Sequence, residues 1–200
     1  FCHWGWAETP DTFRRWYESI DYTNVKATER NNDSRPRAVY NPLLIGAIIG
    51  DIVGSIYEFN PHKSKDINLQ NKDMEYTDDT IMTIAVADWI LNDKNLTKKG
   101  LVARMQQWGR KCPNPMGAYG GMFSQWLSSN NPKPYNSWGN GAAMRVAAVG
   151  FAFSSLEETL KVAQKSAEVT HNHPEGIKGA QATAAAIFMA RTGSTKEEIR

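Results

Sequence analysis

Apolar residues recur at helical spacing through most of the chain beyond residue 40. Between Pro42 and Phe59, isoleucines stand at positions 45, 48, 49, 52 and 56, which is the spacing of one helix face. The same pattern, together with cap residues, predicts further helices at 80–91, 101–111, 122–128, 142–153, 155–169 and 176–191. No segment keeps the period-two alternation of a half-buried strand. We therefore predict an all-α fold, with loops rich in Gly, Pro and Asn between the helices.

Residues 1–40 differ from the rest of the chain and carry three of its seven tryptophans. Thr9 can cap a helix and Pro10 suits its first position, and the apolar face that follows consists of Phe13, Trp16, Tyr17 and Ile20. The polar segment 26–37 has the composition of a linker. We expect residues 1–40 to be an N-terminal extension, or the tail of an upstream domain with its linker, and residues 41–200 to be one partial domain.

The last residues predict a helix end followed by a new helix start. Gly193 suits the position just after a helix, where a left-handed conformation is common. Ser194 and Thr195 precede two glutamates at the spacing of a capping box. The sequence ends after barely one further turn, and one turn costs more to nucleate than it returns. We expect that the natural polypeptide continues or that this tail frays.

Composition limits the classes of function. The chain has 23 Lys and Arg against 21 Asp and Glu, so its net charge of +2 gives no general attraction to nucleic acid or to a membrane surface. No apolar run reaches the roughly 18 residues of a transmembrane helix, and the first residues lack the basic and apolar regions of a signal peptide. Cys2 and Cys112 leave a single disulfide open but give no disulfide framework. This usage predicts a reducing, cytoplasmic setting.

Two adjacent carboxylates, Asp78 and Asp79, stand directly before the apolar run 81–91. Two like charges about 4 Å apart repel by roughly 4 kcal/mol at an effective dielectric near 20, and a helix N-terminus offsets only about 0.3–1 kcal/mol per charge. A divalent cation would offset the rest, with Thr77 or Thr80 adding a neutral oxygen. The alternative is a helix N-cap with an extra acid in the first turn.

The predicted helix 42–59 carries two further acids and a row of glycines. Asp51 interrupts an apolar run, so it must be paired, hydrogen-bonded or protonated, or it caps a neighbouring helix. Glu58 either acts on a water molecule or leaving group, or is a solvated acid at a helix end. Gly46, Gly50 and Gly54 fall on one helix face, which suggests that another backbone or a ligand comes very close.

Two glycine-containing segments are candidate ligand contacts. The loop 136–141 leads into a predicted helix, so its backbone N–H groups could cradle an anion, with Trp138 as a stacking surface; otherwise it is an ordinary loop. Arg145 is either a phosphate partner or a clamp on a carboxylate. The pair Gly120–Gly121 allows a ligand to approach the backbone closely.

His171 and His173 follow the helix that is expected to end near residue 170. The spacing suggests zinc, but the chain has only four histidines and no cysteine nearby, so a zinc site has little support. A histidine that hydrogen-bonds a ligand or a helix end fits the sequence better.

Taken in order, these segments resemble the ADP-ribosylglycohydrolase family, which includes the dinitrogenase reductase-activating glycohydrolases. The resemblance covers about residues 43–192, and its matching stretches are Gly46–Gly54 with Glu58, Tyr76–Thr80, Tyr119–Met122, Ser137–Arg145 and Thr170–Pro174. It implies an orthogonal bundle of helices around a cleft with two magnesium ions. It also implies hydrolysis of the bond between C1″ of the distal ribose of ADP-ribose and an amino-acid side chain or another acceptor.

The resemblance assigns roles to residues of this chain. Thr77, Asp78 and Asp79 correspond to Mg²⁺ ligands, and Glu58 and Asp79 to catalytic residues. The residues implied to bind ADP-ribose are Gly121, Met122, Ser137, Trp138, Gly139, Asn140, Gly141 and His171. The implied partner is ADP-ribose or an ADP-ribosylated protein, with no membrane and no nucleic acid except as a modified substrate.

The sequence departs from the family in one respect. The family completes its metal pair with a second Asp-x-Asp-Thr type motif near the C-terminus, whereas no Asp follows Asp93 here. We expect a chain that lacks the last helices and the second half-site, with weak metal binding and poor or absent hydrolysis. Besides a hydrolase, the sequence is therefore compatible with a non-catalytic ADP-ribose-binding or structural relative; the near-neutral charge disfavours a nucleic-acid module. Arginine, serine, acetyl-ADP-ribose and nucleic-acid linkages all remain open.

Overall fold

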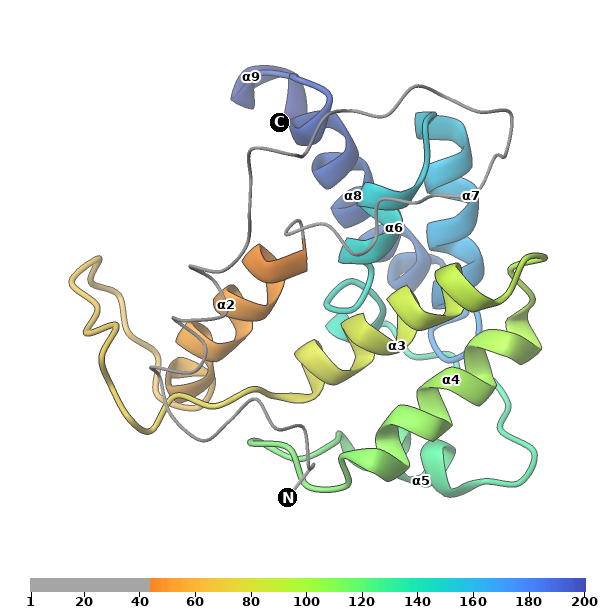
Figure 1. The fold of residues 1–200 in the computed structure, drawn as a ribbon, viewed down its shortest axis with the longest axis horizontal. Helices are drawn as coiled ribbons and strands as arrows, with labels where there is room; N and C mark the ends of the chain where they lie inside the picture. The colour runs from red at the N-terminus through yellow and green to blue at the C-terminus, as the bar shows by residue number, and fades with distance from the viewer. Residues whose placement is uncertain (1–43) are drawn as a thin grey trace. The chain divides into compact units, whose positions relative to one another are not determined.

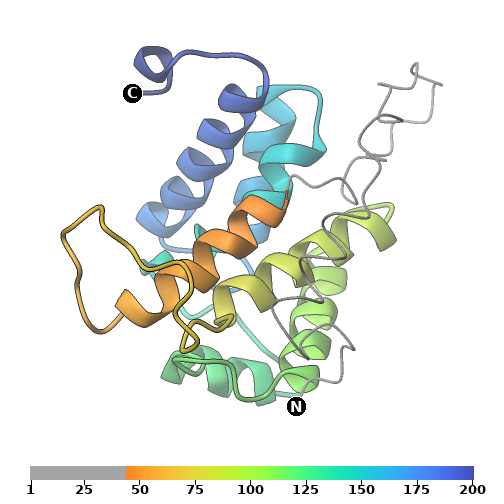
Figure 2. The same cartoon turned by 60° about the vertical axis from the view of Figure 1, so that its left-hand side comes forward.

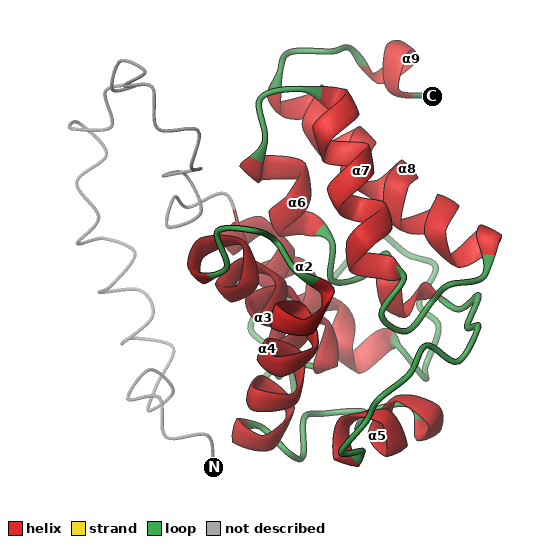
Figure 3. Ribbon diagram, turned by 90° about the vertical axis from the view of Figure 1, so that its right-hand side faces the viewer, coloured by secondary structure: helices red, strands yellow, loops and turns green. Residues whose placement is uncertain are grey.

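The structure is a computed structural model, and it describes residues 44–200. This part of the chain consists of helices and loops. No strand occurs in this range (Figure 3), so the all-α prediction is confirmed. None of these helices is both long and apolar enough to cross a membrane. The elements are α2 (Ile45–Gly54), η4 (Ser55–Tyr57), α3 (Asp78–Asn92), α4 (Lys98–Lys111), α5 (Gly121–Ser128), η5 (Asn140–Ala142), α6 (Ala147–Ala152), α7 (Leu156–Ala167), α8 (Pro174–Arg191) and α9 (Lys196–Ile199). The helix and linker expected within residues 9–37 lie outside the described range.

Helix α3 is the central element of the described part, and it contacts α2, α4 and α6 (Figure 1). Nine of its 15 residues are buried, on several sides of the helix. Met82 and Trp89 are fully buried among them. A helix that is apolar on most of its circumference is expected to be enclosed by others, and this position fixes where its N-terminus, with Asp78 and Asp79, can lie.

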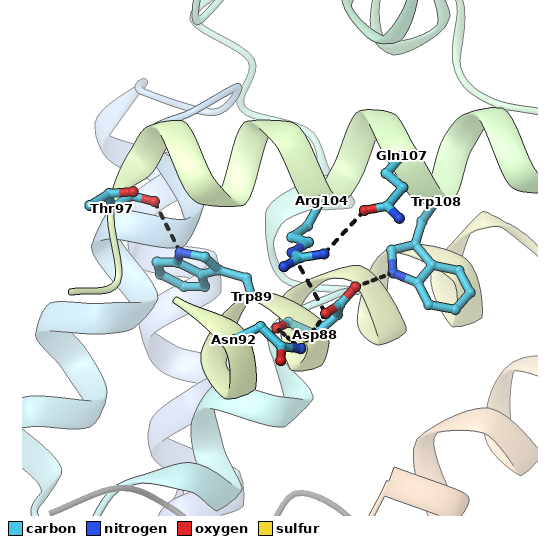
Figure 4. Close-up of polar contacts among 7 residues, drawn as sticks. All are labelled: Asp88, Trp89, Asn92, Thr97, Arg104, Gln107 and Trp108. Carbon is cyan, nitrogen blue, oxygen red and sulfur yellow. Dashed lines mark hydrogen bonds and ion pairs between the residues drawn. The ribbon is translucent and has the colours of Figure 1, made fainter. Parts of the chain in front are cut away.

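Polar contacts join α3 to α4 (Figure 4). Asp88 accepts a hydrogen bond of 2.8 Å from Trp108 Nε1 and lies 3.6 Å from Arg104 Nε. Trp89, one residue further along α3, donates from its indole to the carbonyl oxygen of Thr97 at 2.9 Å. These bonds replace the hydrogen bonds to water that the indole and carboxylate groups lose when the helices pack.

Helices α6, α7 and α8 form a second group, in which α8 packs against both others (Figure 2, cyan to blue). At Gly150 of α6, a Cβ atom would lie only 2.6 Å from Cβ of Ile187 and 2.9 Å from the carbonyl oxygen of Ala184. The two helices, α6 and α8, therefore approach each other closely at Gly150. The buried residues of α8 are limited to Gly176, Ala180 and Ala184.

The predicted helix 42–59 is shorter in the structure. The α-helix ends at Gly54 and a 3₁₀ turn extends to Tyr57, so Glu58 lies just beyond it. Ser55 explains the change, because its hydroxyl donates to the carbonyl of Ile52 at 2.8 Å and accepts from the N–H of Glu75 at 3.2 Å. This side chain ties the end of α2 to the chain that returns toward α3.

The predicted helix 142–153 is also wrong in its first half. A 3₁₀ turn covers Asn140–Ala142, and α6 begins only at Ala147. Arg145 lies between them with its side chain turned inward, where Nη1 donates to the carbonyl oxygen of Gly141 at 3.0 Å. A buried guanidinium that requires backbone acceptors favours this irregular backbone over a continuous helix.

The close approach expected at the glycines of α2 is not found. A Cβ atom at Gly46, Gly50 or Gly54 would meet no atom of residues 44–200 within 4 Å. None of the residues of α2 is buried, although the helix is strongly apolar. Within the described range, the glycine row is therefore not a contact between backbones.

The predicted helix end at Gly193 and helix start at Thr195 are confirmed. Gly193 has a φ of 96°, and Ser194 N–H bonds the carbonyl of Met189 at 3.0 Å, as in a Schellman motif. The Thr195 hydroxyl accepts from the N–H of Glu198, whose carboxylate accepts from the N–H of Thr195 at 2.8 Å. This reciprocal capping box opens α9.

Candidate functional site

The acidic turn, residues Thr77–Thr80, starts helix α3. Thr77 is the N-cap, and its hydroxyl accepts a hydrogen bond from the N–H of Asp79 at 3.2 Å. The N-cap alternative therefore holds for Thr77. Asp78 and Asp79 both lie in the first turn of α3, as that alternative expected, and within residues 44–200 neither carboxylate caps a backbone N–H of another residue.

Asp51 of α2 holds this turn in place. Its Oδ1 accepts from the hydroxyl of Thr77 at 2.6 Å, and its Oδ2 accepts from the N–H of Thr77 at 2.9 Å. The same Oδ2 accepts from the N–H of Thr80 at 3.2 Å and from its hydroxyl at 2.5 Å. The interpretation of Asp51 as a cap on a neighbouring helix is thus correct, and the cap fixes the backbone that carries Asp78 and Asp79.

The carboxylates of the acidic turn are held in an unfavourable electrostatic environment. Burial, with the charges of Asp79 and Glu58, raises the pKa of Asp78 from 3.8 to about 7. Burial, with the charges of Asp51 and Glu58, raises the pKa of Asp79 to about 6. Within residues 44–200, neither carboxylate forms an ion pair with a basic side chain. Protonation or a bound cation would relieve this repulsion.

The acidic turn offers the kind of ligand atoms that a hard dication binds, but too few of them to complete a site. Two carboxylates and the Thr77 hydroxyl are the oxygen ligands that Mg²⁺ takes, usually together with several waters. In the described part of the chain, however, no three His, Cys, Asp or Glu side chains converge as a metal centre would require. The turn can therefore supply one side of a magnesium site.

Glu58 lies beside the loop between α4 and α5. A Cβ atom at Gly117 would lie 3.0 Å from Glu58 Oε2, and Gly117 has a φ of 77° that favours glycine. An isolated bridge between Thr77 and Met116 holds this loop against the acidic turn. The Glu58 carboxylate is exposed and contributes to the raised pKa values of Asp78 and Asp79, so it lies near both.

A cleft of about 220 Å³ joins the acidic turn to the glycine-rich segments. Its lining includes most of the residues predicted to contact a ligand and three that were not predicted. The predicted ones are Asp78, Gly120, Gly121, Met122, Ser137, Gly139, Asn140, Gly141, Arg145 and His171; the others are Phe123, Tyr135 and Met144. Phe123 and Met144 adjoin predicted residues, and Tyr135 adjoins the predicted loop 136–141. Their position beside these motifs was the sequence signal that could have identified them. Thr77, Asp79, Glu58 and Trp138 are not part of the lining.

The N-terminus of α5 borders the cleft, and the first N–H groups of this helix, from Gly121 onward, have no intrahelical partner. Gly120 is the N-cap of α5 and has no side chain to bond the first N–H groups of that helix. A Cβ atom at either glycine would meet no atom within 4 Å, so both face open space. An oxyanion can approach such a helix start without obstruction.

The loop that carries Ser137 and Gly141 is pinned to the segment that carries His171. Tyr135 N–H bonds the carbonyl of Thr170 at 3.2 Å, and Asn136 N–H bonds Asn172 Oδ1 at 2.8 Å. Asn136 has a φ of 53°, which turns the chain toward the cleft. Two segments separated by about 35 positions thus form one wall of the cleft.

Trp138 and His173 lie outside the lining. The Trp138 side chain is 76% exposed, and its ring centroid lies 6.0 Å from that of His173. His173 is the N-cap of α8, where its Nδ1 accepts from the N–H of Glu175 at 3.1 Å. The interpretation of a histidine at a helix end therefore applies to His173.

Arg145 and His171 share a buried network at the floor of the cleft. Arg145 Nη2 donates to the carbonyl of Ser166 at 3.0 Å and to Thr170 Oγ1 at 2.8 Å. Thr170 Oγ1 lies 2.7 Å from His171 Nδ1. The arginine is therefore a clamp, as expected, but on carbonyl and hydroxyl oxygens rather than on a carboxylate. Burial lowers its pKa to about 10, and burial with the arginine charge lowers the pKa of His171 to about 4.

Comparison with known proteins identifies related sequences. A family model described as ADP-ribosylglycohydrolase matches residues 32–200. ADP-ribosylhydrolase ARH3 of Mus musculus is 30% identical over 184 residues, which cover 78% of this chain and 50% of the mouse protein. The Homo sapiens protein of the same name is 29% identical over 194 residues, covering 82% and 53%.

A bacterial protein gives a similar match. ADP-ribosylarginine hydrolase Tri1 of Pseudomonas putida (strain GB-1) is 28% identical over 180 residues, covering 78% of this chain and 47% of that protein. The chain spans about half the length of the curated relatives it matches.

Proposed function

Because the chain belongs to the ADP-ribosylglycohydrolase family, we propose that it is part of an enzyme that removes ADP-ribose from modified targets. The bond cut joins C1″ of the distal ribose to an acceptor, and the reaction depends on magnesium. The observation that carries this proposal is the cleft that joins Asp78 of the acidic turn to the glycine-rich segments and His171. A sugar diphosphate needs both an anion cradle and polar groups beside its reacting ribose.

The binding roles follow from the groups around the cleft. The free N–H donors at Gly121 and Met122 are suited to phosphate oxygens, because a helix N-terminus attracts an anion without the desolvation cost of a buried lysine. The 137–141 wall adds the Ser137 hydroxyl and open backbone. Trp138 is exposed beside this wall, where it can stack on a base that extends beyond the cleft.

The acidic turn is suited to the magnesium end of the ligand. Thr77, Asp78 and Asp79 would hold the ion, which supplies charge stabilisation and a grip on ribose hydroxyls. Asp51 keeps these groups in register by bonding both threonines of the turn. The raised pKa values of Asp78 and Asp79 support the assignment, because a dication would relieve the crowding of negative charge.

Glu58 is the proposed group for proton transfer. Its exposed carboxylate lies outside the cleft lining but beside Gly117, on the loop that is bridged to Thr77. From there it can take a proton from water or assist the leaving group once a ligand fills the cleft. Asp79 is proposed to contribute next to it through the metal.

The size of the cleft limits what it can enclose. Its volume of about 220 Å³ is below the roughly 300–1,000 Å³ of most small-molecule sites. ADP-ribose would therefore extend past this lining. Relatives are named for ADP-ribosylarginine and for ADP-ribose in general, so arginine is one candidate linkage among those left open by the sequence.

A second candidate is a non-catalytic ADP-ribose-binding protein. It is favoured by the finding that, within residues 44–200, no three His, Cys, Asp or Glu side chains converge as a metal centre would require. Such a protein would keep the cleft wall and the α5 donors but bind the metal weakly. It differs from the first candidate in its response to magnesium.

Calorimetry with ADP-ribose, in magnesium and in EDTA, separates the two candidates. An enzyme should bind more tightly with magnesium and release ADP-ribose from a modified protein in a turnover assay. Asp78→Asn should abolish the magnesium effect, whereas Asp73→Asn, on an exposed loop, should not change it. Binding that ignores magnesium, without turnover, supports the second candidate. Absence of binding in both conditions contradicts both.

A further inference from the structure

The network at the floor of the cleft determines which hydrogen bonds each of its members can make. Arg145 is 1% exposed and Thr170 is fully buried, so water cannot replace a missing partner at either. An arginine side chain can only donate. Its contact with Thr170 Oγ1 at 2.8 Å therefore makes the hydroxyl oxygen an acceptor. The direction of the next bond follows from this.

The Thr170 hydroxyl has one hydrogen, which needs an acceptor. Apart from Arg145, the side chain has only one hydrogen-bond contact among residues 44–200, which is His171 Nδ1 at 2.7 Å. If Nδ1 carried a proton, arginine and histidine would both donate to the oxygen, and the buried hydroxyl hydrogen would have no acceptor. The satisfied arrangement has the hydroxyl donating to an unprotonated Nδ1.

Burial and the arginine charge both keep the imidazole neutral. Burial of the ring, with the positive charge of Arg145 as the smaller cause, lowers the pKa of His171 to about 4. A neutral imidazole with an unprotonated Nδ1 must carry its hydrogen on Nε2. The ring would then be a donor at Nε2 over the whole neutral pH range.

The Nε2 atom lies where a ligand can reach it. His171 is part of the cleft lining, and a Cβ atom at Gly141 would come within 3.0 Å of Nε2. The absence of a side chain at Gly141 thus leaves room for this edge of the ring. No residue in the 44–200 range accepts a hydrogen bond from Nε2.

We propose that Arg145 and Thr170 are positioning residues that hold His171 as its Nε2–H tautomer, so that it donates a hydrogen bond to an oxygen of the bound ligand. The inference rests on the proposed function for the identity of that ligand, an ADP-ribose group. The Arg145 Nη atoms bond the carbonyls of Gly141 and Ser166 and the Thr170 hydroxyl. Its effect on the ligand therefore passes through that hydroxyl and the His171 ring.

The tautomer can be measured without any ligand. Two-bond ¹H–¹⁵N correlation spectra of the ¹⁵N-labelled chain distinguish protonated from unprotonated ring nitrogens, and the chain has only four histidines. A His171→Gln variant identifies the signals of His171. We expect an unprotonated Nδ1 and a protonated Nε2 from about pH 6 to about pH 8, where an ordinary histidine changes its charge. A protonated Nδ1 in the wild-type chain would overturn the proposal.

Two substitutions of Thr170 test the role of the hydroxyl. Thr170→Val keeps the shape and removes the donor, so the Nδ1–H tautomer should gain population and the Kd for ADP-ribose should rise about tenfold. Thr170→Ser keeps the hydroxyl and should restore both values to within about threefold of the wild type. Circular dichroism checks that each variant is folded.

The outcomes separate this proposal from the proposed function. An unchanged His171 tautomer in folded Thr170→Val overturns the proposal even if affinity falls. If Thr170→Val does not fold, the wild-type spectrum and Thr170→Ser still decide the matter. Failure of the wild-type chain to bind ADP-ribose contradicts the proposed function, whereas the tautomer is read in its absence.

Discussion

The hydroxyl of Thr77 donates a hydrogen bond to Asp51 Oδ1 at 2.6 Å, although 26 positions separate the two residues in the sequence. The bond joins α2 to the start of α3, and Oδ2 of the same carboxylate bonds Thr80. One acid of the predicted first helix thus sets the backbone of the acidic turn. It holds the backbone that carries Asp78 and Asp79 without itself lining the cleft.

Asp51→Ala should lower the free energy of unfolding by about 1–3 kcal/mol, because it leaves two hydroxyl and two N–H groups without their acceptor. Urea denaturation measures this change. Asp73→Ala is the matched control, since Asp73 is exposed and its removal should change stability by less than about 0.5 kcal/mol. Equal effects of the two substitutions would mean that Asp51 does not anchor the turn.

The contribution of Asp78 and Asp79 to stability without metal should fall as the pH rises from about 4 to about 7. Their pKa values, about 7 and about 6, exceed the ordinary value of 3.8, so these two groups bind more protons in the folded chain than in the unfolded chain in this window. In EDTA at pH 8, Asp78→Asn should raise the free energy of unfolding by about 1–2 kcal/mol after allowance for solvent screening. At pH 4 it should have little effect.

Urea denaturation at both pH values tests this dependence, with Asp73→Asn as an exposed control. The control should follow the wild-type curve. If Asp78→Asn were equally neutral at pH 8, the carboxylates would not be crowded in the folded chain.

Gly141→Ala should weaken ADP-ribose binding about tenfold or more, because its Cβ atom would lie 2.9 Å from Cε1 of His171 and displace the ring. Gly179→Ala, in α8, is the control: its Cβ atom would lie 4.0 Å from that of Ala143, an ordinary contact. That change should leave affinity unaltered and stabilise α8 by about 0.5–1 kcal/mol. Calorimetry and urea denaturation of both variants provide the comparison.

Gly50→Ala should stabilise this chain by about 0.5–1 kcal/mol, because alanine favours the helix and the new Cβ atom meets nothing within 4 Å. Thermal and urea unfolding of the variant measure the change. A clear loss of stability would show instead that another group covers the glycine face of α2 in solution.

Local signals predicted the elements whose ends are fixed by neighbouring residues. The C′ position of Gly193 and the capping box of Thr195 and Glu198 were confirmed, because both depend on contacts over a few positions. The apolar run after Asp79 likewise predicted α3, since burial on most sides requires such a run. The resemblance then indicated which loops meet at the cleft.

Contacts between distant segments account for the errors. The expected helix 142–153 is interrupted because Arg145 turns inward to carbonyls of Gly141 and Ser166, which periodicity does not reveal. The glycines of α2 resembled a close contact, yet their face is open. Tyr135 was overlooked because its position in the cleft depends on a backbone bond to Thr170 rather than on a motif.

The exposure of α2 affects how long the acidic turn keeps its conformation. None of the residues of this helix is buried, and weakly buried segments are the first to open in native-state fluctuations. Each opening would withdraw Asp51 from the start of α3 and let Asp78 and Asp79 move apart. The persistence of the acidic turn is therefore coupled to that of α2, and whatever shields this helix from opening would also keep Asp78 and Asp79 together.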